Sequence, residues 1–440
     1  MIVTELKLAN LRGVATAEFR FQPGFNLVVG VNGVGKTTML DALRICMSRI
    51  LPQMTLSRAK VLSFQVEDIK KGFPFLDVTV RANVGGEDVR FTRIQWGEKV
   101  ASDDPANLDR LRRQILETER LQDRPRNLLR ALEESQDLDD TDFYTPESSQ
   151  LRRMAQRLTT PPLCIFYSTN RSVIAEGGPL TGKAVKNAAA AAYADALVRR
   201  SWNITRFADW MRAQVALASE SLIASQHVIA LQTAASRFLP EYSGLRIGDT
   251  TAGRLVVDKG GEALDMRQLS DGERGILAMV LDLASRLSQA NPGLSDPLEK
   301  GQAVVLIDEI ELHLHPRWQR QIVRNLTDAF PRCQFIATTH SPQVIGEVAH
   351  DRIQIIANGQ VYSPTHSYGV DSSRVLEEIM DVPSRTESVQ ESLTQISHAI
   401  GMYHFDAARS LLSVLVEQLG EDDPEVTRVR TLLAFMEGEE

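Results

Sequence analysis

The feature that most constrains the fold of this chain is the octapeptide GVNGVGKT at residues 30–37. An apolar run with the composition of a buried strand, FNLVVG (25–30), comes directly before it, and residues 36–50 have helical periodicity. The spacing GxxxxGKS/T between a strand and a helix is typical of a phosphate-binding loop, because glycines let successive N–H groups point at one anion. A glycine-rich turn before an ordinary helix is the alternative, and the lysine and threonine argue against it.

The motif assigns a role to each of its polar side chains. We expect Lys36 to contact the β- and γ-phosphate oxygens of ATP, and Thr37 to provide a hydroxyl ligand for Mg²⁺. Glycines in the loop allow the backbone to approach the phosphates closely. The residues expected to bind nucleotide in this segment are Asn32, Gly33, Gly35, Lys36, Thr37 and Thr38.

A second apolar run, VVLI (304–307), ends in Asp308 and Glu309. Burial of such a strand places both carboxylates at its C-terminal edge, where open α/β sheets bind ligands. We expect Asp308 to complete the Mg²⁺ site with Thr37, and Glu309 to orient and polarise the attacking water. Two acids that only cap a strand are the alternative, which the upstream phosphate-loop motif disfavours.

The segment ELHLHP (311–316) places one acid and two histidines at alternate positions, a pattern that invites a zinc site. No further ligand of suitable spacing accompanies them. We therefore favour an ordinary loop after the acidic strand, with His315 close to the start of the next helix.

The segment LSDGER (269–274) directly precedes a strongly apolar helix. A serine and a glycine at a helix N-terminus, here Ser270 and Gly272, can bind an anion. An ordinary helix cap by Ser270 or Asp271 is the alternative. The segment on its own favours the ordinary cap, and only its place in the order of motifs favours the anion site.

The segment TTHSP (338–342) overlaps the end of another apolar strand, QFIATTH (334–340). His340 at this strand end is placed to hydrogen-bond a γ-phosphate. A neutral histidine that is hydrogen-bonded only within its loop is the alternative. With the phosphate loop and the acidic strand also present, we favour the catalytic role.

The four motifs, in this order along the chain, resemble those of the ABC-type ATPase heads of the SMC and RecF class. The resemblance implies an α/β fold, with a mixed sheet and flanking helices, and catalysis by Glu309, Asp308 and His340 with ATP and Mg²⁺. It also implies a homodimer or higher homo-oligomer, in which Ser270 and Gly272 of one subunit contact the γ-phosphate held by the other.

Two features depart from the pattern of that class. Asp271 stands where the class commonly has glycine, so a carboxylate would lie near the phosphate of the other subunit. No glutamine clearly matches the glutamine loop of such heads. Gln65 is one candidate, and the loop that contains Asn170 and Arg171 is another.

Longer phrases narrow the resemblance. QLSDGERGILAMVLDLASRL, VVLIDEIELHLHPRWQR and FPRCQFIATTHSPQVIG are similar to the predicted ATP-binding proteins of the PtuA type, from Septu and certain retron antiphage systems. This resemblance implies an ATPase that gates a separately encoded HNH-type nuclease. The alternatives are a RecF-like ATPase of DNA repair or chromosome maintenance, the energising subunit of a transporter, and a nucleotide sensor with little hydrolysis.

The order of predicted elements divides the chain into four regions. They are the N-terminal half of the ATPase head (1–100), a mainly helical insertion (101–240, with a head strand at 162–170), the C-terminal half of the head (241–371) and a C-terminal helical assembly region (372–440). The last region is predicted to be helical over 372–380, 386–400, 403–419 and 424–437. It contains no cluster of Asp, Glu and His that would suggest a nuclease.

The insertion is predicted to be helical over 105–137 and from Lys186 to about Pro240. Between Arg110 and Arg130 there are seven arginines and three acids. A solvated helix paired with its own acids is the interpretation we favour. A face that follows the phosphates of DNA is the alternative, and it would make DNA binding strongly dependent on salt.

Composition limits the partners and the compartment. The net charge of −8 does not favour polyanion binding in bulk, so any contact with DNA must use a local basic patch. The three cysteines form no CxxC motif, which fits a reducing compartment. No stretch reaches the ~18 apolar residues that a membrane-spanning helix needs. We therefore expect a cytoplasmic protein with no membrane partner.

Overall fold

The structure is a computed structural model, and it describes residues 1–55, 57, 60–97, 148–158, 160–172, 174–175, 188–199, 202–248, 254–380 and 382–437. The chain divides into two compact units, Met1–Val370 and Asp371–Glu440, which are described separately. Among the described residues, no helix has both the length and the apolar character needed to cross a membrane. The arginine-rich helix predicted over 105–137 lies outside the described residues.

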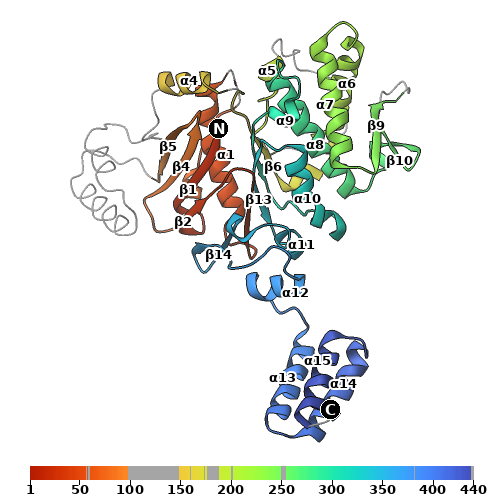
Figure 1. Cartoon of the computed structure of the whole chain (residues 1–440). Coiled ribbons are helices and arrows are strands. Elements are labelled where there is room, and N and C mark those ends of the chain that lie inside the picture. Colours follow the sequence, from red (N-terminus) through yellow and green to blue (C-terminus); the bar gives the residue numbers. More distant parts are fainter. Residues whose placement is uncertain are drawn as a thin grey trace, which may run out of the picture. The chain divides into compact units, whose positions relative to one another are not determined.

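A six-stranded sheet forms the centre of the first unit (Figure 1). Its strands, in spatial order, are β15 (Gln360–Tyr362), β14 (Ile353–Ala357), β3 (Phe25–Gly30), β13 (Gln334–Thr339), β12 (Val304–Ile307) and β6 (Cys164–Tyr167). All neighbours are parallel except β15, which pairs antiparallel with β14. The parallel core strands are almost entirely buried, as expected for strands covered on both faces.

An antiparallel four-stranded sheet accompanies the central one. Its order is β2 (Val14–Arg20), β1 (Ile2–Leu11), β4 (Phe75–Val84) and β5 (Glu87–Trp96). Helix α1 (Lys36–Met54) contacts strands of both sheets, and side chains from all three form one apolar core. Because α1 is enclosed in this way, it is buried around most of its circumference, and its N-terminus is fixed at the edge of the central sheet.

Two glutamine side chains join the sheets. The amide of Gln334, at the start of β13, accepts a hydrogen bond from the Val3 N–H (2.8 Å) and donates one to the Val3 carbonyl (2.7 Å). The amide of Gln354, in β14, does the same with the N–H and carbonyl of Arg20 (2.9 and 2.7 Å). Each amide therefore makes the pair of bonds that a neighbouring strand would make.

Helices α8 (Asp271–Ala290) and α10 (Pro316–Ala329) lie on the side of the central sheet opposite to α1 (Figure 1). The remaining helices of the first unit are α4 (Ser148–Gln156), α5 (Ala188–Ala191), α6 (Ile204–Leu217), α7 (Leu222–Phe238), α9 (Pro297–Lys300) and α11 (Pro342–Ile345). A small sheet of β9 (Tyr242–Ile247), β10 (Leu255–Lys259) and β11 (Glu262–Asp265) leads into α8. Helix α8 is buried over most of its length because α5, α7, α9 and the turn after β6 all pack against it.

The prediction of helix from Lys186 to about Pro240 is wrong in part. Residues Trp202–Asn203 form strand β8, which pairs with β7 (Ile174–Ala175), and a break at 218–221 separates α6 from α7. The side chains of Asn203 and Ser221 cap the two helices. The pairing of β8 depends on residues distant in sequence, which a local periodicity does not reveal.

The second unit is a short turn followed by three helices. Its elements are α12 (Ser372–Arg374), a π-helical turn (Val375–Ile379), α13 (Glu387–Gly401), α14 (Phe405–Leu419) and α15 (Pro424–Glu437). The three long helices begin and end within two residues of their predicted bounds, and they enclose a core of their own. The α/β fold expected from the sequence, a mixed sheet with flanking helices followed by C-terminal helices, is confirmed.

Candidate functional site

The phosphate-loop motif connects β3 to α1 at the C-terminal edge of the central sheet. Gly33 and Gly35 have φ angles of 79° and 113°, which L side chains rarely adopt. A Cβ atom added to Gly35 would also lie 2.8 Å from a methyl carbon of Val14. No side chain caps α1, and its first turn contains no acid. The positive end of the helix dipole therefore faces the loop without a carboxylate from the helix's own first turn.

Lys36 is held against its own loop. Its ammonium group donates to the carbonyls of Gly30 (2.7 Å) and Val31 (3.1 Å), and the residue is 6% exposed. Burial lowers the pKa of Lys36 to about 8, although the carboxylates of Glu309 and Asp308 act in the opposite direction. The group therefore stays charged at pH 7, beside a loop that is shaped for an anion.

Asp308, directly after β12, contacts both the start of α1 and the end of β13. Its carboxylate accepts hydrogen bonds from the Thr37 hydroxyl (3.1 Å) and the Thr338 hydroxyl (2.8 Å), and the residue is 4% exposed. The Thr37 and Asp308 oxygens are the hard oxygen donors that Mg²⁺ prefers. The donor set therefore fits the ion expected from the sequence, and the fold brings these two predicted residues into contact.

The backbone of Glu309 is unusual. Its φ angle is 48°, in the left-handed region, which few non-glycine residues occupy. The Glu309 N–H donates to the Thr338 hydroxyl (2.8 Å), and the Glu309 carbonyl accepts from the guanidinium of Arg171. The residue that we expect to orient water is thus fixed on both sides of its Cα atom.

The sequence suggests no role for Glu311 other than as a metal ligand. In the structure its side chain binds the end of β13. Its carboxylate accepts hydrogen bonds from the Thr339 hydroxyl (2.7 Å) and from the backbone N–H of His340 (2.6 Å). Among the described residues, no three or more side chains of His, Cys, Asp and Glu are grouped so that they could hold a metal ion. Glu311 therefore ties the loop after β12 to the end of β13, which positions His340.

His340 lies at the same edge of the sheet. Burial, and then the positive charge of Lys36, lower the pKa of His340 below its ordinary value, although the nearby carboxylates act in the opposite direction. The imidazole is therefore neutral at pH 7. A neutral ring can still donate one hydrogen bond to a phosphate oxygen.

The LSDGER segment forms the N-terminus of α8. The exposed Ser270 caps the helix, and its hydroxyl donates to the carboxylate of Glu273 (2.7 Å). Gly272 lies against the loop after β12, where an added Cβ atom would be 2.3 Å from the carbonyl oxygen of His313. The exposed Asp271 forms an ion pair with Arg274. The start of α8 is thus packed on the acidic loop and is still accessible from outside.

The sequence names Arg171 only as part of a candidate glutamine loop, and the structure places its side chain at the acidic strand. It lies in the 3₁₀ helix η2 (Thr169–Ser172) directly after β6, and its guanidinium donates to the carbonyls of Asp308 and Glu309. Gln65, the other candidate for the glutamine loop, is exposed and caps a separate turn with Asp68. The signal for Arg171 was its position after a buried strand that adjoins β12.

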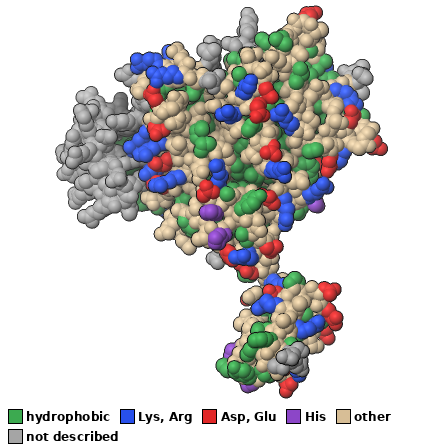
Figure 2. Space-filling model, in the orientation of Figure 1, with side chains coloured by type: hydrophobic (Ala, Val, Ile, Leu, Met, Phe, Trp, Pro, Cys, Tyr) green, Lys and Arg blue, Asp and Glu red, His purple; other side chains and the backbone are tan. Residues whose placement is uncertain are grey.

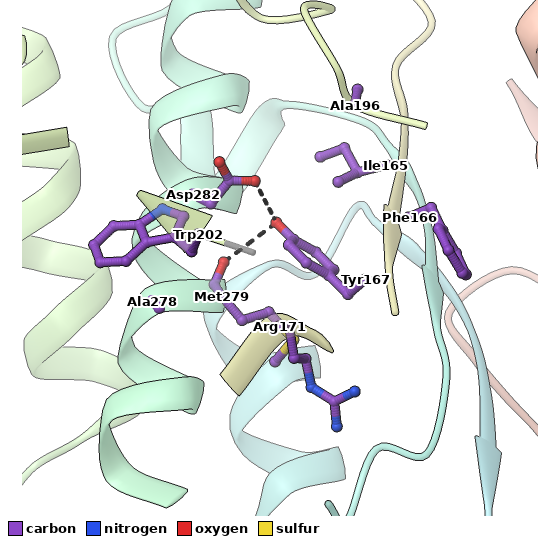
Figure 3. A pocket seen from close by; sticks show the side chains of 9 residues that line it. All are labelled: Ile165, Phe166, Tyr167, Arg171, Ala196, Trp202, Ala278, Met279 and Asp282. Carbon is purple, nitrogen blue, oxygen red and sulfur yellow. Dashed lines mark hydrogen bonds between the residues drawn. The ribbon is translucent and has the colours of Figure 1, made fainter. Parts of the chain in front are cut away.

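A small cavity separates the turn after β6 from α8 (Figure 3). Its volume is about 20 Å³, and Tyr167, Arg171, Trp202 and Asp282 are among the side chains that line it. That volume holds about one water molecule, so the cavity is not a nucleotide site. The Tyr167 hydroxyl crosses it to donate to the Asp282 carboxylate (3.0 Å).

The local basic patch for DNA was predicted for a segment outside the described residues. Figure 2 shows basic and acidic side chains mixed over the visible face of the first unit. Several charges of the first unit are paired, and Arg12, for example, contacts both Asp41 (2.9 Å) and Asp68 (2.8 Å). DNA binding therefore stays a prediction.

A family model described as "AAA domain, putative AbiEii toxin, Type IV TA system" matches residues 25–346, which is more than half of the chain. The match begins at β3 and ends after His340, so it includes every motif named above. This range contains the phosphate loop, the start of α8, the acidic strand and His340.

Three curated relatives are similar to parts of the chain. They are the Retron Ec83 probable ATPase of Escherichia coli (38% identity over 44% of this chain and 36% of the relative), the Retron Vc95 probable ATPase of Vibrio cholerae (43%, over 31% and 26%) and the Septu protein PtuA of Bacillus mycoides (42%, over 19% and 12%). The chain therefore covers only a minor part of the length of each of these relatives, 36% at most. These matches confirm the resemblance to the PtuA-type ATPases.

Proposed function

The chain belongs to the family described as "AAA domain, putative AbiEii toxin, Type IV TA system", and from this membership we propose that it is an antiphage-defence ATPase that binds and hydrolyses ATP with Mg²⁺. The retron and Septu names of its relatives support the defence role. The observation that carries the ATPase proposal is the hydrogen bond between Thr37 and Asp308, which are 271 positions apart in the sequence.

Each side chain at the sheet edge has a place in the proposed reaction. Lys36 leaves its loop carbonyls to contact the β- and γ-phosphate oxygens, and Thr37 with Asp308 holds Mg²⁺, which neutralises phosphate charge when bound. Glu309 orients the attacking water and accepts its proton. The water oxygen bonds to the γ-phosphorus as the bond to the β,γ-bridging oxygen breaks, which releases ADP and phosphate. His340 donates to the γ-phosphate.

The phosphate loop provides the rest of the proposed nucleotide contacts. Its N–H groups at Gly33 and Gly35 point at the phosphates, while Asn32 and Thr38 flank them. Thr38 is buried and Asn32 is exposed. We expect Asn32 to contact nucleotide from the open side of the loop, and Thr38 to support the first turn of α1.

The proposed assembly is a dimer that closes around ATP. Ser270 and Gly272 at the start of α8 then contact the γ-phosphate bound by the second subunit. The exposure of Ser270 supports this role, because an accessible helix N-terminus is a ready anion site. The Asp271 carboxylate would repel the γ-phosphate, and its ion pair with Arg274 reduces that repulsion.

We further propose that this ATPase gates a separately encoded HNH-type nuclease. The similarity to the Septu protein PtuA supports a separate defence partner. The direct experiment is to express the chain with its neighbouring reading frames and to identify what co-purifies. Purification of the ATPase free of any nuclease from cells that express both would contradict this part of the proposal.

The variant Glu309→Gln tests the ATPase proposal itself. It removes the group that accepts the proton of water and leaves the Thr37–Asp308 pair intact. We expect ATP affinity within about threefold of wild type and hydrolysis slower by about two orders of magnitude or more. Light scattering with ATP should show a trapped dimer.

The matched control is Glu299→Gln, at an exposed glutamate of α9. It should keep wild-type turnover. Wild-type turnover in Glu309→Gln would assign the base elsewhere. Tight ATP binding without turnover in the wild-type protein would favour a nucleotide sensor over an ATPase.

A further inference from the structure

The conformation of Glu309 requires an explanation beyond its own sequence. Its φ angle of 48° is unfavourable for a residue with a Cβ atom, and such strain persists only where the surroundings hold it. On the N-terminal side, the Glu309 N–H bonds to the Thr338 hydroxyl at 2.8 Å. On the C-terminal side, two backbone bonds restrain the next peptide group: the Ile310 N–H donates to the Thr338 carbonyl (2.9 Å), and the Leu312 N–H donates to the Glu309 carbonyl (3.0 Å).

Arg171 adds a side-chain restraint that joins the peptide groups on both sides of the Glu309 Cα atom. One guanidinium nitrogen donates to the carbonyl of Asp308, and the other donates to the carbonyl of Glu309. The planar fork of the guanidinium therefore spans two consecutive peptide groups. Since both peptide groups that flank the Glu309 Cα atom are held, the direction of the Cα–Cβ bond, along which the side chain leaves the backbone, is held as well.

Among the described residues, no carboxylate forms a salt bridge with the Arg171 guanidinium, so an ion pair with them does not explain its burial. Arg171 is 9% exposed, and the hydrogen bonds of its guanidinium run to backbone carbonyls, including that of Ser168 (3.2 Å). Asp282 lines the same cavity, but Figure 3 shows the guanidinium pointing away from it. Asp282 instead accepts from Arg286 and Tyr167.

The carboxylates of the acidic loop help to keep the Arg171 guanidinium charged. Burial lowers the pKa of Arg171 to about 10, and the carboxylates of Glu311, Asp308 and Glu309 act against that decrease. The group is therefore protonated at neutral pH. A charged donor makes a stronger hydrogen bond to a carbonyl than a neutral one does.

We propose that Arg171 is a positioning residue, which holds the Glu309 backbone so that its carboxylate points at the water that attacks the γ-phosphate. The inference rests on the proposed ATPase function and goes beyond it, because it assigns the turn after β6 to the chemical step. Arg171 contacts neither nucleotide nor water in this role and acts only through Glu309.

The alternative is that Arg171 only stabilises the fold, and Arg286 provides a matched control for that role. Arg286 is 4% exposed, and its guanidinium donates to the carbonyls of Ala192 (2.6 Å) and Ala194 (3.0 Å). It is thus a second buried arginine that braces backbone, at a place away from the acidic strand.

The experiment compares Arg171→Lys with Arg286→Lys. Lysine keeps the charge and the aliphatic chain at each site, so both proteins should fold, but an ammonium group cannot span two carbonyls in a plane. We expect Arg171→Lys to lower kcat tenfold or more, with the Kd for ATP within threefold of wild type. Arg286→Lys should keep the wild-type kcat, even if it lowers Tm by as much as Arg171→Lys does.

A double variant tests whether Arg171 acts through Glu309. In single-turnover measurements, Arg171→Lys should slow the Glu309→Gln protein no further, because residues that act as a unit are not additive. An additive loss would overturn the inference. Wild-type kcat in Arg171→Lys, or a raised KM with unchanged kcat, would overturn it too.

The proposed function fails in a different way. If the wild-type protein hydrolyses no more ATP than Lys36→Ala does, the ATPase proposal falls and the role of Arg171 falls with it. If the wild-type protein is active and Arg171→Lys equals it, only the role of Arg171 falls.

Discussion

At the scale of single residues, Lys36 makes the proposed nucleotide site sensitive to pH. Burial sets the pKa of Lys36 at about 8, below its ordinary value of 10.5. The folded protein therefore binds this proton less tightly than the unfolded chain. Between pH 8 and pH 10.5 the unfolded chain holds more protons, so this group makes stability rise with pH in that window.

ATP should reverse that shift, because its phosphates favour the charged ammonium group. We predict that ATP binding at pH 8.5 takes up protons and that affinity falls as pH rises above about 8, by up to about tenfold per unit. Calorimetry in buffers of different ionisation enthalpy measures the uptake. His340 contributes none of it, because its lowered pKa leaves it neutral at that pH.

The control is Lys36→Ala, which should lose most ATP affinity together with the proton uptake. Affinity that is unchanged between pH 7 and pH 9.5 in the wild-type protein would contradict the assignment of Lys36 to the phosphates.

The residues with distinctive motifs could be predicted, and those that act through the backbone could not. Thr37 and Asp308 were expected to meet because a phosphate loop and an acidic strand end share one edge of a sheet. Arg171 and Glu311 bind backbone groups, and a backbone carbonyl or N–H is the same at every position. No residue pattern therefore marks such contacts, and only the fold reveals them.

At the scale of elements, the start of α8 is fixed by a close backbone approach. In an ordinary helix an alanine is more stable than a glycine by roughly 0.5–1 kcal/mol. At Gly272 the added Cβ atom would be 2.3 Å from the His313 carbonyl oxygen, so α8 or the loop after β12 must move. We predict that Gly272→Ala lowers the free energy of unfolding by about 1–3 kcal/mol and also slows ATP hydrolysis.

Denaturant unfolding and ATPase assays measure the two effects. Gly293→Ala is the control, because a Cβ atom there meets nothing within 4 Å. It should change stability by less than about 0.5 kcal/mol. Equal stability of the two variants would contradict the prediction, because it would show that α8 and the acidic loop can move apart at little cost in free energy.

The elements of the central sheet were predictable because their apolar runs are continuous. Runs such as VVLI and QFIATT are buried on both faces, and each lies next to a motif that sets its direction. Strand β8 was missed because it has only two residues and its partner β7 lies 28 positions earlier. Short strands of this kind are specified by long-range pairing, and the local sequence around them still has helical character.

At the scale of the whole molecule, the C-terminal unit has a core separate from that of the head. Apolar side chains of α13, α14 and α15, among them Ile396, Leu415 and Val426, pack on one another. Other large apolar side chains of this unit, such as Tyr403 and Phe435, are exposed. The role of this unit in assembly stays a prediction, which the exposed aromatic groups motivate.

We predict that deletion of residues 386–440 leaves ATP affinity within about threefold of wild type, since every proposed nucleotide ligand lies in the first unit. The same deletion should abolish higher assembly or recruitment of the partner. Calorimetry, light scattering and a pull-down with the co-expressed neighbours measure these properties. The substitutions Tyr403→Ser and Phe435→Ser test the same role at two exposed aromatic side chains without removing the helices. A folded, ATP-binding truncation that still assembles would show that these helices are dispensable.

The amide groups of Gln334 and Gln354 decide where the head can bend. Each is bonded through both of its polar atoms to a strand of the other sheet, so a hinge between the two sheets would break four hydrogen bonds. Leaving such groups unpaired costs about 1–3 kcal/mol each. We therefore expect the two sheets to travel as one rigid body during an ATP cycle. Because the interior of each head would keep its shape, a partner protein would then respond to the relative orientation of the two heads.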